Sequence, residues 1–158
     1  MEYDKAYEFC IKGQVRLGNL SEAETLELLA DGRVASLFLE KQLTKWFPQL
    51  KHITGCKDHD HIMELQTNTG TTIIKFDQKS FTRSGGCRFM PSYMIGAGRK
   101  FDEESFRAHA KNISYIICDI TRLPAMKVVF KRGPDLIERY PRGIISKTHR
   151  SRSELFYE

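Results

Sequence analysis

The spacing of apolar residues along the chain predicts two helices, followed by a change to strands. The segment NLSEAETLELLADG carries Ser21 and, three residues later, Glu24, a pattern that predicts a capping box at the start of a short helix ended by Gly32. The segment RVASLFLEKQLTKWFPQL repeats apolar residues at helical spacing and stops at Pro48, so we expect an amphipathic helix packed on the core. Its apolar positions are Val34, Leu37, Phe38, Leu43 and Phe47.

From residue 60 onward the period becomes that of strands. HIMELQ alternates, TNTG has turn chemistry and TTIIKFDQKSF alternates again, which predicts a β-hairpin over residues 60–81. A long glycine-rich, basic connection follows, and then a helix in DEESFRAHAKN with Asp102 as its N-cap. The nearly all-apolar run ISYIICDI predicts a central strand buried on both faces. With a strand in MKVVFKR, a short helix in PDLIERY and a last strand in GIIS, the fold class is α/β or α+β, a mixed sheet flanked by helices.

Composition limits the class of protein. The chain has 158 residues, of which 41% are hydrophobic and 28% charged, as expected of one globular domain over residues 1–158. It has neither an apolar run of ~20 residues nor a signal-peptide pattern, so we expect a cytoplasmic protein. The four cysteines form no CxxC pair and are expected to be free thiols. A zinc site is the alternative, built from Cys56, His59, His61 and Cys87.

Positive charge is concentrated in the second half of the chain. The net charge is +5, and residues 122–152 carry nine lysines and arginines against two acids. This imbalance favours a polyanion such as nucleic acid as partner, although each cation taken alone is as well explained by solubility. The candidate phosphate contacts are Arg83, Arg88, Arg99, Lys100, Lys147, Arg150 and Arg152.

The second strand of the predicted hairpin carries an unusual charged face. Alternation places Asp77 and Lys79 side by side, and a carboxylate beside a lysine suits Mg²⁺-dependent phosphodiester hydrolysis. With a turn near Thr69–Gly70, partner numbers sum to about 137–139, so a second carboxylate, Asp60, falls close to this pair. Glu64 is the second choice, because it lies roughly 13 Å further along the strand at ~3.3 Å per residue and needs a bulge to shift the register.

A helix, a hairpin bearing Asp60 and Asp77-x-Lys79, a second helix and a buried strand together resemble the PD-(D/E)xK nuclease superfamily, most of all small type II restriction endonucleases. The resemblance covers about residues 34–120. It implies that Asp60 and Asp77 bind one or two Mg²⁺ ions, that the Gln78 carbonyl adds a ligand, and that Lys79 orients the attacking water or stabilises charge on the phosphate. It also implies a helix glutamate near the metal, here Glu40. Gln78 stands where the family usually has an apolar residue.

The resemblance implies a function. We expect a Mg²⁺-dependent endodeoxyribonuclease that cuts double-stranded DNA at specific sites as a homodimer, with the basic part, residues 121–158, contacting DNA. A junction- or mismatch-directed nuclease of the same fold, and a non-catalytic nucleic-acid-binding module, are the alternatives.

Overall fold

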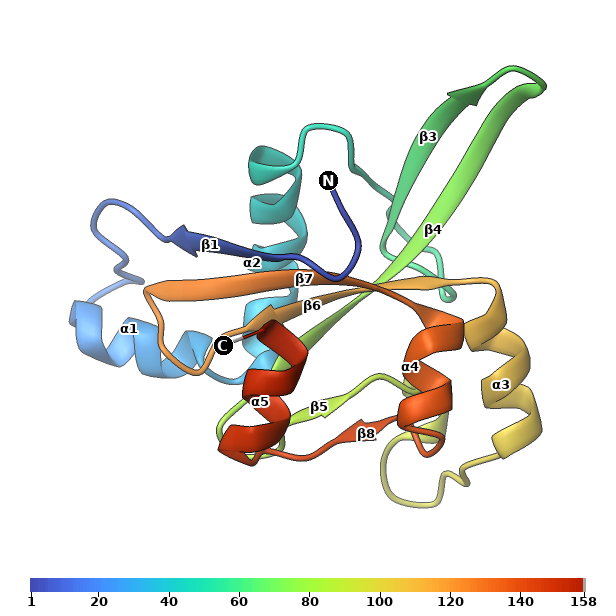
Figure 1. Ribbon diagram of the computed structural model, residues 1–158. Coiled ribbons are helices and arrows are strands. Elements are labelled where there is room, and N and C mark those ends of the chain that lie inside the picture. The colour runs from blue at the N-terminus through green and yellow to red at the C-terminus, as the bar shows by residue number, and fades with distance from the viewer. Residues whose placement is uncertain (158) are drawn as a thin grey trace.

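A six-stranded mixed sheet runs through the computed structural model, which describes residues 1–157 (Figure 1). The strand order is β1-β7-β6-β4-β3-β2, in which β4 and β6 are parallel and the other neighbours antiparallel. This agrees with the mixed α/β sheet predicted above. The strands are β1 (Ala6–Cys10), β2 (Lys51–His52), β3 (His61–Thr67), β4 (Gly70–Phe81), β6 (Ser114–Asp119) and β7 (Ala125–Arg132), and β5 (Cys87–Arg88) and β8 (Ile144–Ile145) form a separate pair.

Helices cover both faces of this sheet. One face packs on α2, and the other on α3, α4 and α5, each with its own group of buried side chains. All six residues of β6 are buried, which confirms the strand predicted from ISYIICDI. Within the described part of the chain, no helix has the length and apolar character needed to cross a membrane. The helices are α1 (Glu22–Leu29), α2 (Gly32–Trp46), α3 (Glu103–Lys111), α4 (Gly133–Arg139) and α5 (His149–Phe156), with a 3-10 turn, η1, at Ser92–Met94.

The predicted helix starts are confirmed, but one predicted helix end and part of one predicted core stripe are wrong. The first helix ends at Leu29, and Gly32, predicted to end it, is the first residue of α2. The Ser21 side chain accepts from the Glu24 N–H, and Glu24 accepts from the Ser21 N–H, so the capping box is present. On α2 the buried stripe is Ala35, Leu39 and Leu43. Val34 and Leu37, predicted to be core residues, are 41% and 70% exposed, because they lie ~100° and ~160° around the helix from Ala35.

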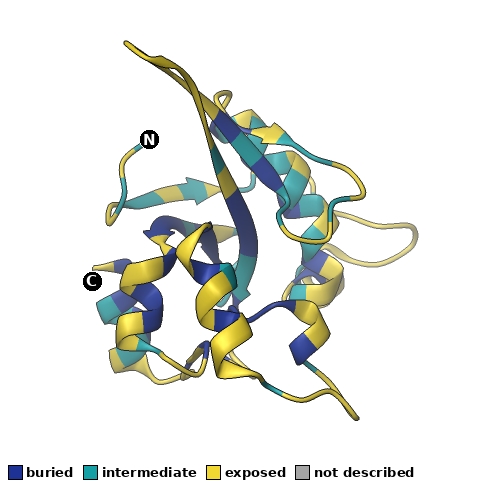
Figure 2. Cartoon of the chain, turned by 90° about the vertical axis from the view of Figure 1, so that its right-hand side faces the viewer, coloured by how far each residue is buried: buried dark blue, intermediate teal, exposed yellow. Residues whose placement is uncertain are grey.

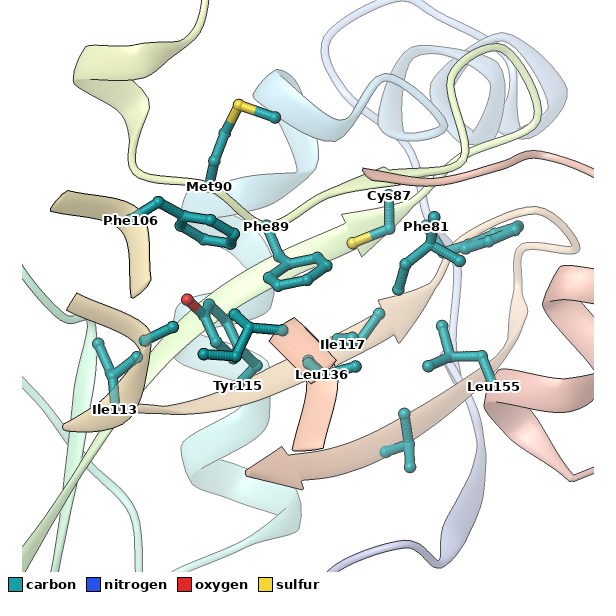
Figure 3. Close-up of a cluster of buried hydrophobic side chains, with 14 of the residues drawn as sticks. Phe81, Cys87, Phe89, Met90, Phe106, Ile113, Tyr115, Ile117, Leu136 and Leu155 are labelled. Atoms are coloured by element: carbon teal, nitrogen blue, oxygen red, sulfur yellow. The ribbon is translucent and has the colours of Figure 1, made fainter. Parts of the chain in front are cut away.

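The connection after β4 supplies part of the core. Phe89 packs edge-on against Tyr115 of β6, with ring centroids 5.2 Å apart, and Phe106 of α3 lies 5.6 Å away (Figure 3). Gly86 has a φ of +67° and passes so close to β8 that a Cβ atom would lie 2.2 Å from the Ile145 carbonyl oxygen. Close packing against β8 therefore requires glycine at this position, and the first part of this connection is fixed rather than mobile.

The β3–β4 hairpin extends beyond the sheet. Its register pairs His61 with Phe76 and continues to Thr67 with Gly70, so partner numbers sum to 137, within the predicted range. Strand β2 pairs only with His61 and Ile62, and β6 pairs with β4 only from Phe76 onward. Every residue from 64 to 73 is exposed, and we call this segment the ribbon; Figure 2 shows it projecting from the body of the protein.

A buried ion pair joins the last helix to the central sheet. Arg152 on α5 donates from Nε to Asp119 Oδ2 at 2.6 Å, and the two residues are 7% and 1% exposed. The prediction that Arg152 contacts DNA phosphate is therefore wrong, since its guanidinium faces inward to the end of β6. The sequence showed its charge but not its orientation.

Substituting Arg152 tests this structural role. The Arg152→Met protein leaves Asp119 buried without its cation, so its free energy of unfolding should fall by about 3–5 kcal/mol in urea denaturation. Arg150→Met is the matched control, because Arg150 is exposed and pairs with Glu154 at the surface; its midpoint should stay near that of the wild type. Equal midpoints for the two variants would contradict the assignment.

Candidate active site

The candidate site lies where β3 separates from β4. Phe76 is the last residue of β4 paired with β3 and the first paired with β6. Beyond it, β4 keeps β6 on one edge, while its other edge faces an open cavity of about 810 Å³ next to the start of α2. Gln78 and Lys79 line this cavity, and so do Arg33, Arg83 and Arg88.

Asp77 and Lys79 form an ion pair on one face of β4. Lys79 Nζ lies 2.9 Å from Asp77 Oδ2, and the two side chains are only 17% and 12% exposed. Asp77 is paired across the sheet with Tyr115, whose ring belongs to the apolar layer beneath the site. The ion pair therefore lies on a layer of apolar side chains, and its Lys79 side lines the cavity.

Asp60 is held beside Asp77 by backbone hydrogen bonds. Its N–H donates to the Phe76 carbonyl at 2.9 Å, one position out of the register of the hairpin, and its Oδ2 accepts from the Gln78 N–H at 2.7 Å. Burial, together with the neighbouring Asp60 carboxylate, raises the pKa of Asp77 to about 7, although Lys79 opposes the shift. Two carboxylates thus share one partly buried position, and a cation at this position relieves their repulsion.

Gln78 connects this site to helix α2. Its backbone N–H bonds Asp60, and because the N–H and C=O of one strand residue point to the same edge, its carbonyl also faces the edge that β3 has left. Its side chain points to the opposite face, where Nε2 donates to the Ser36 carbonyl and Oε1 contacts His61 Nε2, both at 3.2 Å. These bonds explain how a glutamine is accommodated at this position.

The structure places Glu40 away from the two carboxylates. Glu40 projects from α2, which covers the other face of the sheet, and its Oε2 lies 2.9 Å from His52 Nε2. Its Oε1 accepts from the Ser36 hydroxyl at 3.2 Å. Through Ser36 and Gln78, Glu40 belongs to the network that supports the site, and it has no direct contact with Asp60 or Asp77 among the described interactions.

The second-choice acid, Glu64, lies on the ribbon. It is paired with Ile73 across the hairpin and forms an ion pair of 2.8 Å with Lys51. No bulge shifts the register toward Asp77. The structure therefore brings Asp60, and not Glu64, next to Asp77.

The donors gathered here suit a hard cation. Within residues 1–157, no three His, Cys, Asp or Glu side chains are grouped to hold a metal ion by themselves. Mg²⁺ is commonly bound by one or two carboxylates, with waters and substrate phosphate completing the shell. Asp60, Asp77 and the Gln78 carbonyl fit this pattern.

The residues of the alternative zinc site are not brought together. Cys56 Sγ lies 3.3 Å from His59 Nδ1, which makes one contact between two of the four candidates. His61 is buried on the α2 face against Gln78, and Cys87 belongs to the apolar core on the opposite face. The four side chains therefore form no common centre.

The predicted phosphate contacts lie in different places. Arg83 and Arg88 line the cavity, with Arg83 Nε donating to the Thr121 carbonyl at 2.5 Å. Arg33, also at the cavity, was not predicted; it lies in the first turn of α2 and pairs with Asp31, and sequence alone does not show that this turn faces β4. The other predicted cations are exposed away from the cavity lining: Arg99, Lys100, Lys147 and Arg150.

Comparison of the chain with protein-family models, curated proteins and solved structures gave no match. Function is therefore inferred from the geometry of the site and from the sequence resemblance.

The shared position of the two carboxylates predicts a stability change with pH. With a folded pKa near 7 and an ordinary value of 3.8, Asp77 keeps in the folded state a proton that the unfolded chain loses. Its effect on stability is therefore increasingly unfavourable as pH rises from about 4 to about 7. Asp77→Asn should unfold at higher urea concentration than wild type at pH 8, by roughly 1–3 kcal/mol, and this difference should vanish near pH 4. A less stable variant at pH 8 would contradict the assignment.

Proposed function

We propose that this protein is a Mg²⁺-dependent endonuclease of the PD-(D/E)xK type that hydrolyses phosphodiester bonds of double-stranded DNA. The observation that carries the proposal is the meeting of Asp60, Asp77 and Lys79 at the point where β3 leaves β4, next to an open cavity bordered by arginines. Structural ion pairs also perturb pKa values, but here two carboxylates and a lysine meet beside an open cavity that Lys79 itself lines.

The order of elements supports the same family. Helix α2 is followed by the antiparallel strands β2, β3 and β4, then by helix α3 and by β6, which is parallel to β4. Asp60 immediately precedes the second of these strands, and Asp77-x-Lys79 lies on the third. These are the positions that the sequence resemblance implies for the metal-binding acids and the lysine.

Each residue then has a chemical role. Asp60, Asp77 and the Gln78 carbonyl would hold Mg²⁺, which when bound supplies positive charge beside the phosphate and favours ionisation of a coordinated water. Lys79 donates to Asp77 in the free protein. With a cation held by the carboxylates, its ammonium would orient the attacking water or stabilise charge on the phosphate. The water oxygen bonds to phosphorus and gives up a proton to solvent. The bond between phosphorus and the leaving sugar oxygen breaks, and that oxygen takes up a proton from solvent. Arg33, Arg83 and Arg88 would bind neighbouring phosphates.

We further propose that the protein works as a homodimer in the cytoplasm, as a type II restriction enzyme does. One copy carries one such site, whereas cutting both strands of a palindrome calls for two sites related by a two-fold axis. Strand β1, at the end of the sheet beyond β7, has an edge that a second copy would pair with. Nicking of a branched or mismatched duplex instead of an intact one would identify a repair or junction nuclease with the same chemistry.

The chemistry is tested by cleavage of plasmid and phage DNA with and without Mg²⁺. Asp77→Ala and Lys79→Ala should each reduce cleavage at least ~100-fold, since each removes a group that acts on the reacting phosphate or its metal. Lys75→Ala is the matched control, because Lys75 lies on the same strand and face but at an exposed position nearer the ribbon. Cleavage that survives in Asp77→Ala, or that needs no divalent cation, would overturn the proposal.

A second pair of variants decides between the two acids. Asp60→Asn should lose both cleavage and the rise in melting temperature that Mg²⁺ produces by binding the folded state. Glu64→Gln, with its side chain paired to Lys51, should keep both properties. The reverse result would assign the second ligand to Glu64. Failure of Mg²⁺ to stabilise the wild type would contradict the metal site altogether.

A further inference from the structure

The ribbon has no structural task in the body of the protein. It is held by its own cross-strand bonds, since β2 ends opposite Ile62 and β6 begins opposite Phe76. All its residues are exposed, and each arm of five residues (64–68 and 69–73, including the turn at 68–69) spans ~16 Å at ~3.3 Å per residue. Figures 1 and 2 show it standing away from the helices that cover the sheet. A projection this long that packs against nothing points to an external partner.

One face of the ribbon continues the face that carries the two carboxylates. Side chains paired across the hairpin lie on the same side, and each second pair repeats that side. Counting back from Asp77 along β4, the second residue is Lys75, opposite Ile62, and the sixth is Thr71, opposite Gln66. The exposed end of the ribbon is therefore aligned with the candidate active site.

The chemistry of that end suits base edges. The Thr71 hydroxyl donates to Gln66 Oε1 at 3.0 Å, which occupies the amide oxygen and leaves the amide nitrogen as the donor that faces outward. The tip, residues 66–72, contains only glutamine, asparagine, threonine and glycine and carries no charge. Uncharged donors of this kind read acceptor atoms of bases without repelling the phosphates on either side.

The apolar residues of the ribbon argue against a second copy of the chain as its partner. Leu65 and Ile73 are 41% and 55% exposed, but they fall on opposite faces of the hairpin. Neither face therefore presents the continuous apolar patch that a stable dimer buries. Glu64 is neutralised by Lys51, so no acidic group on this arm opposes DNA.

We propose that the ribbon enters the major groove of double-stranded DNA and reads base edges through Gln66 and Thr71. The inference rests on the proposed function, because it takes the carboxylates as the position of the cut phosphate. A two-stranded ribbon fits the major groove, which is ~12 Å wide. Six residues separate Asp77 from Thr71, or ~20 Å along the strand, which equals about six base-pair steps at 3.4 Å. The bases read by this arm thus lie about half a helical turn from the cut phosphate.

The test uses DNA in which adenine and guanine are replaced by their 7-deaza forms. This change removes the N7 acceptors of the major groove and leaves the phosphates and the minor groove intact. Duplexes with a randomised central segment are selected on the wild-type protein in EDTA, so that no bond is cut. The selected sequence should bind about tenfold or more weakly as 7-deaza DNA, the effect of losing one good base contact.

Variants on the two faces of the ribbon give the matched comparison. Gln66→Ala and Thr71→Val should bind normal and 7-deaza DNA equally well and lose the preference for the selected sequence. Thr72→Val is the control, because Thr72 neighbours Thr71 but faces the other side, opposite Leu65; it should behave as wild type. All three positions are exposed, so the fold should be kept.

The inference is overturned if wild type binds both forms of DNA equally, if it binds no duplex, or if all three variants keep its preference. A further variant replaces residues 65–72 by Asn-Gly, a two-residue turn. If this shortened protein changes from dimer to monomer in sedimentation equilibrium, the ribbon is a dimer contact and the inference is overturned. Binding in EDTA needs no catalysis, so a failure of the base-reading proposal appears in the binding data alone. A failure of the proposed nuclease function would appear instead as Mg²⁺-independent cleavage or as cleavage unaffected by Asp77→Ala.

Discussion

At Phe76 the strand β4 changes neighbours, and the rest of the molecule is arranged around this change. Before it β4 pairs with β3, and from it onward β4 pairs in parallel with β6. Phe76 is fully buried and packs edge-on against Phe130, with ring centroids 5.8 Å apart, which fixes the crossing point in the core. Each half of β4 is therefore left with one open edge. The first half forms the ribbon, and the second half exposes to the cavity the edge that holds Asp60.

The site shows how a protein keeps two acids together without unfolding. The apolar floor around Tyr115 and the proximity of Asp60 both oppose the charge on Asp77, while Lys79 compensates only in part. The cost is tolerated because the surrounding bonds leave little freedom: Asp60 is fixed by the Gln78 N–H, and the Gln78 side chain is fixed by Ser36 and His61. Helix α2 provides none of the proposed reacting groups, but from the opposite face of the sheet it holds the Gln78 side chain through the Ser36 carbonyl. Such rigid support is typical of sites that bind a cation at short range.

Features that depend on short-range patterns were predictable from the sequence. The capping box at Ser21, the hairpin and its register, and the buried strand β6 follow from neighbouring residues or from the two-residue period. Asp60 was chosen over Glu64 for the same reason, since a hairpin register is set by its turn.

Features that depend on long-range packing were not predictable. Arg150 and Arg152 are two residues apart and look alike in sequence, yet one is exposed and the other buried, because α5, which was not predicted as a helix, turns Arg152 toward Asp119, 33 positions away. The pairing of β1 with β7 and the placement of Arg33 at the cavity also need contacts between distant segments. Likewise, the packing of α2 decides on which face of the sheet Glu40 lies, and the apolar pattern of the helix does not reveal that face.

The independence of the ribbon from the core has an evolutionary consequence. Because no residue from 64 to 73 belongs to the buried layers, insertions here leave those layers and the carboxylates in place. One residue added to each strand lengthens the arm by ~3.3 Å but exchanges its two faces, whereas two added to each strand preserve them. Descendants of this chain would thus be expected to differ in arm length by steps of four residues, acquiring new targets while inheriting an unchanged catalytic centre.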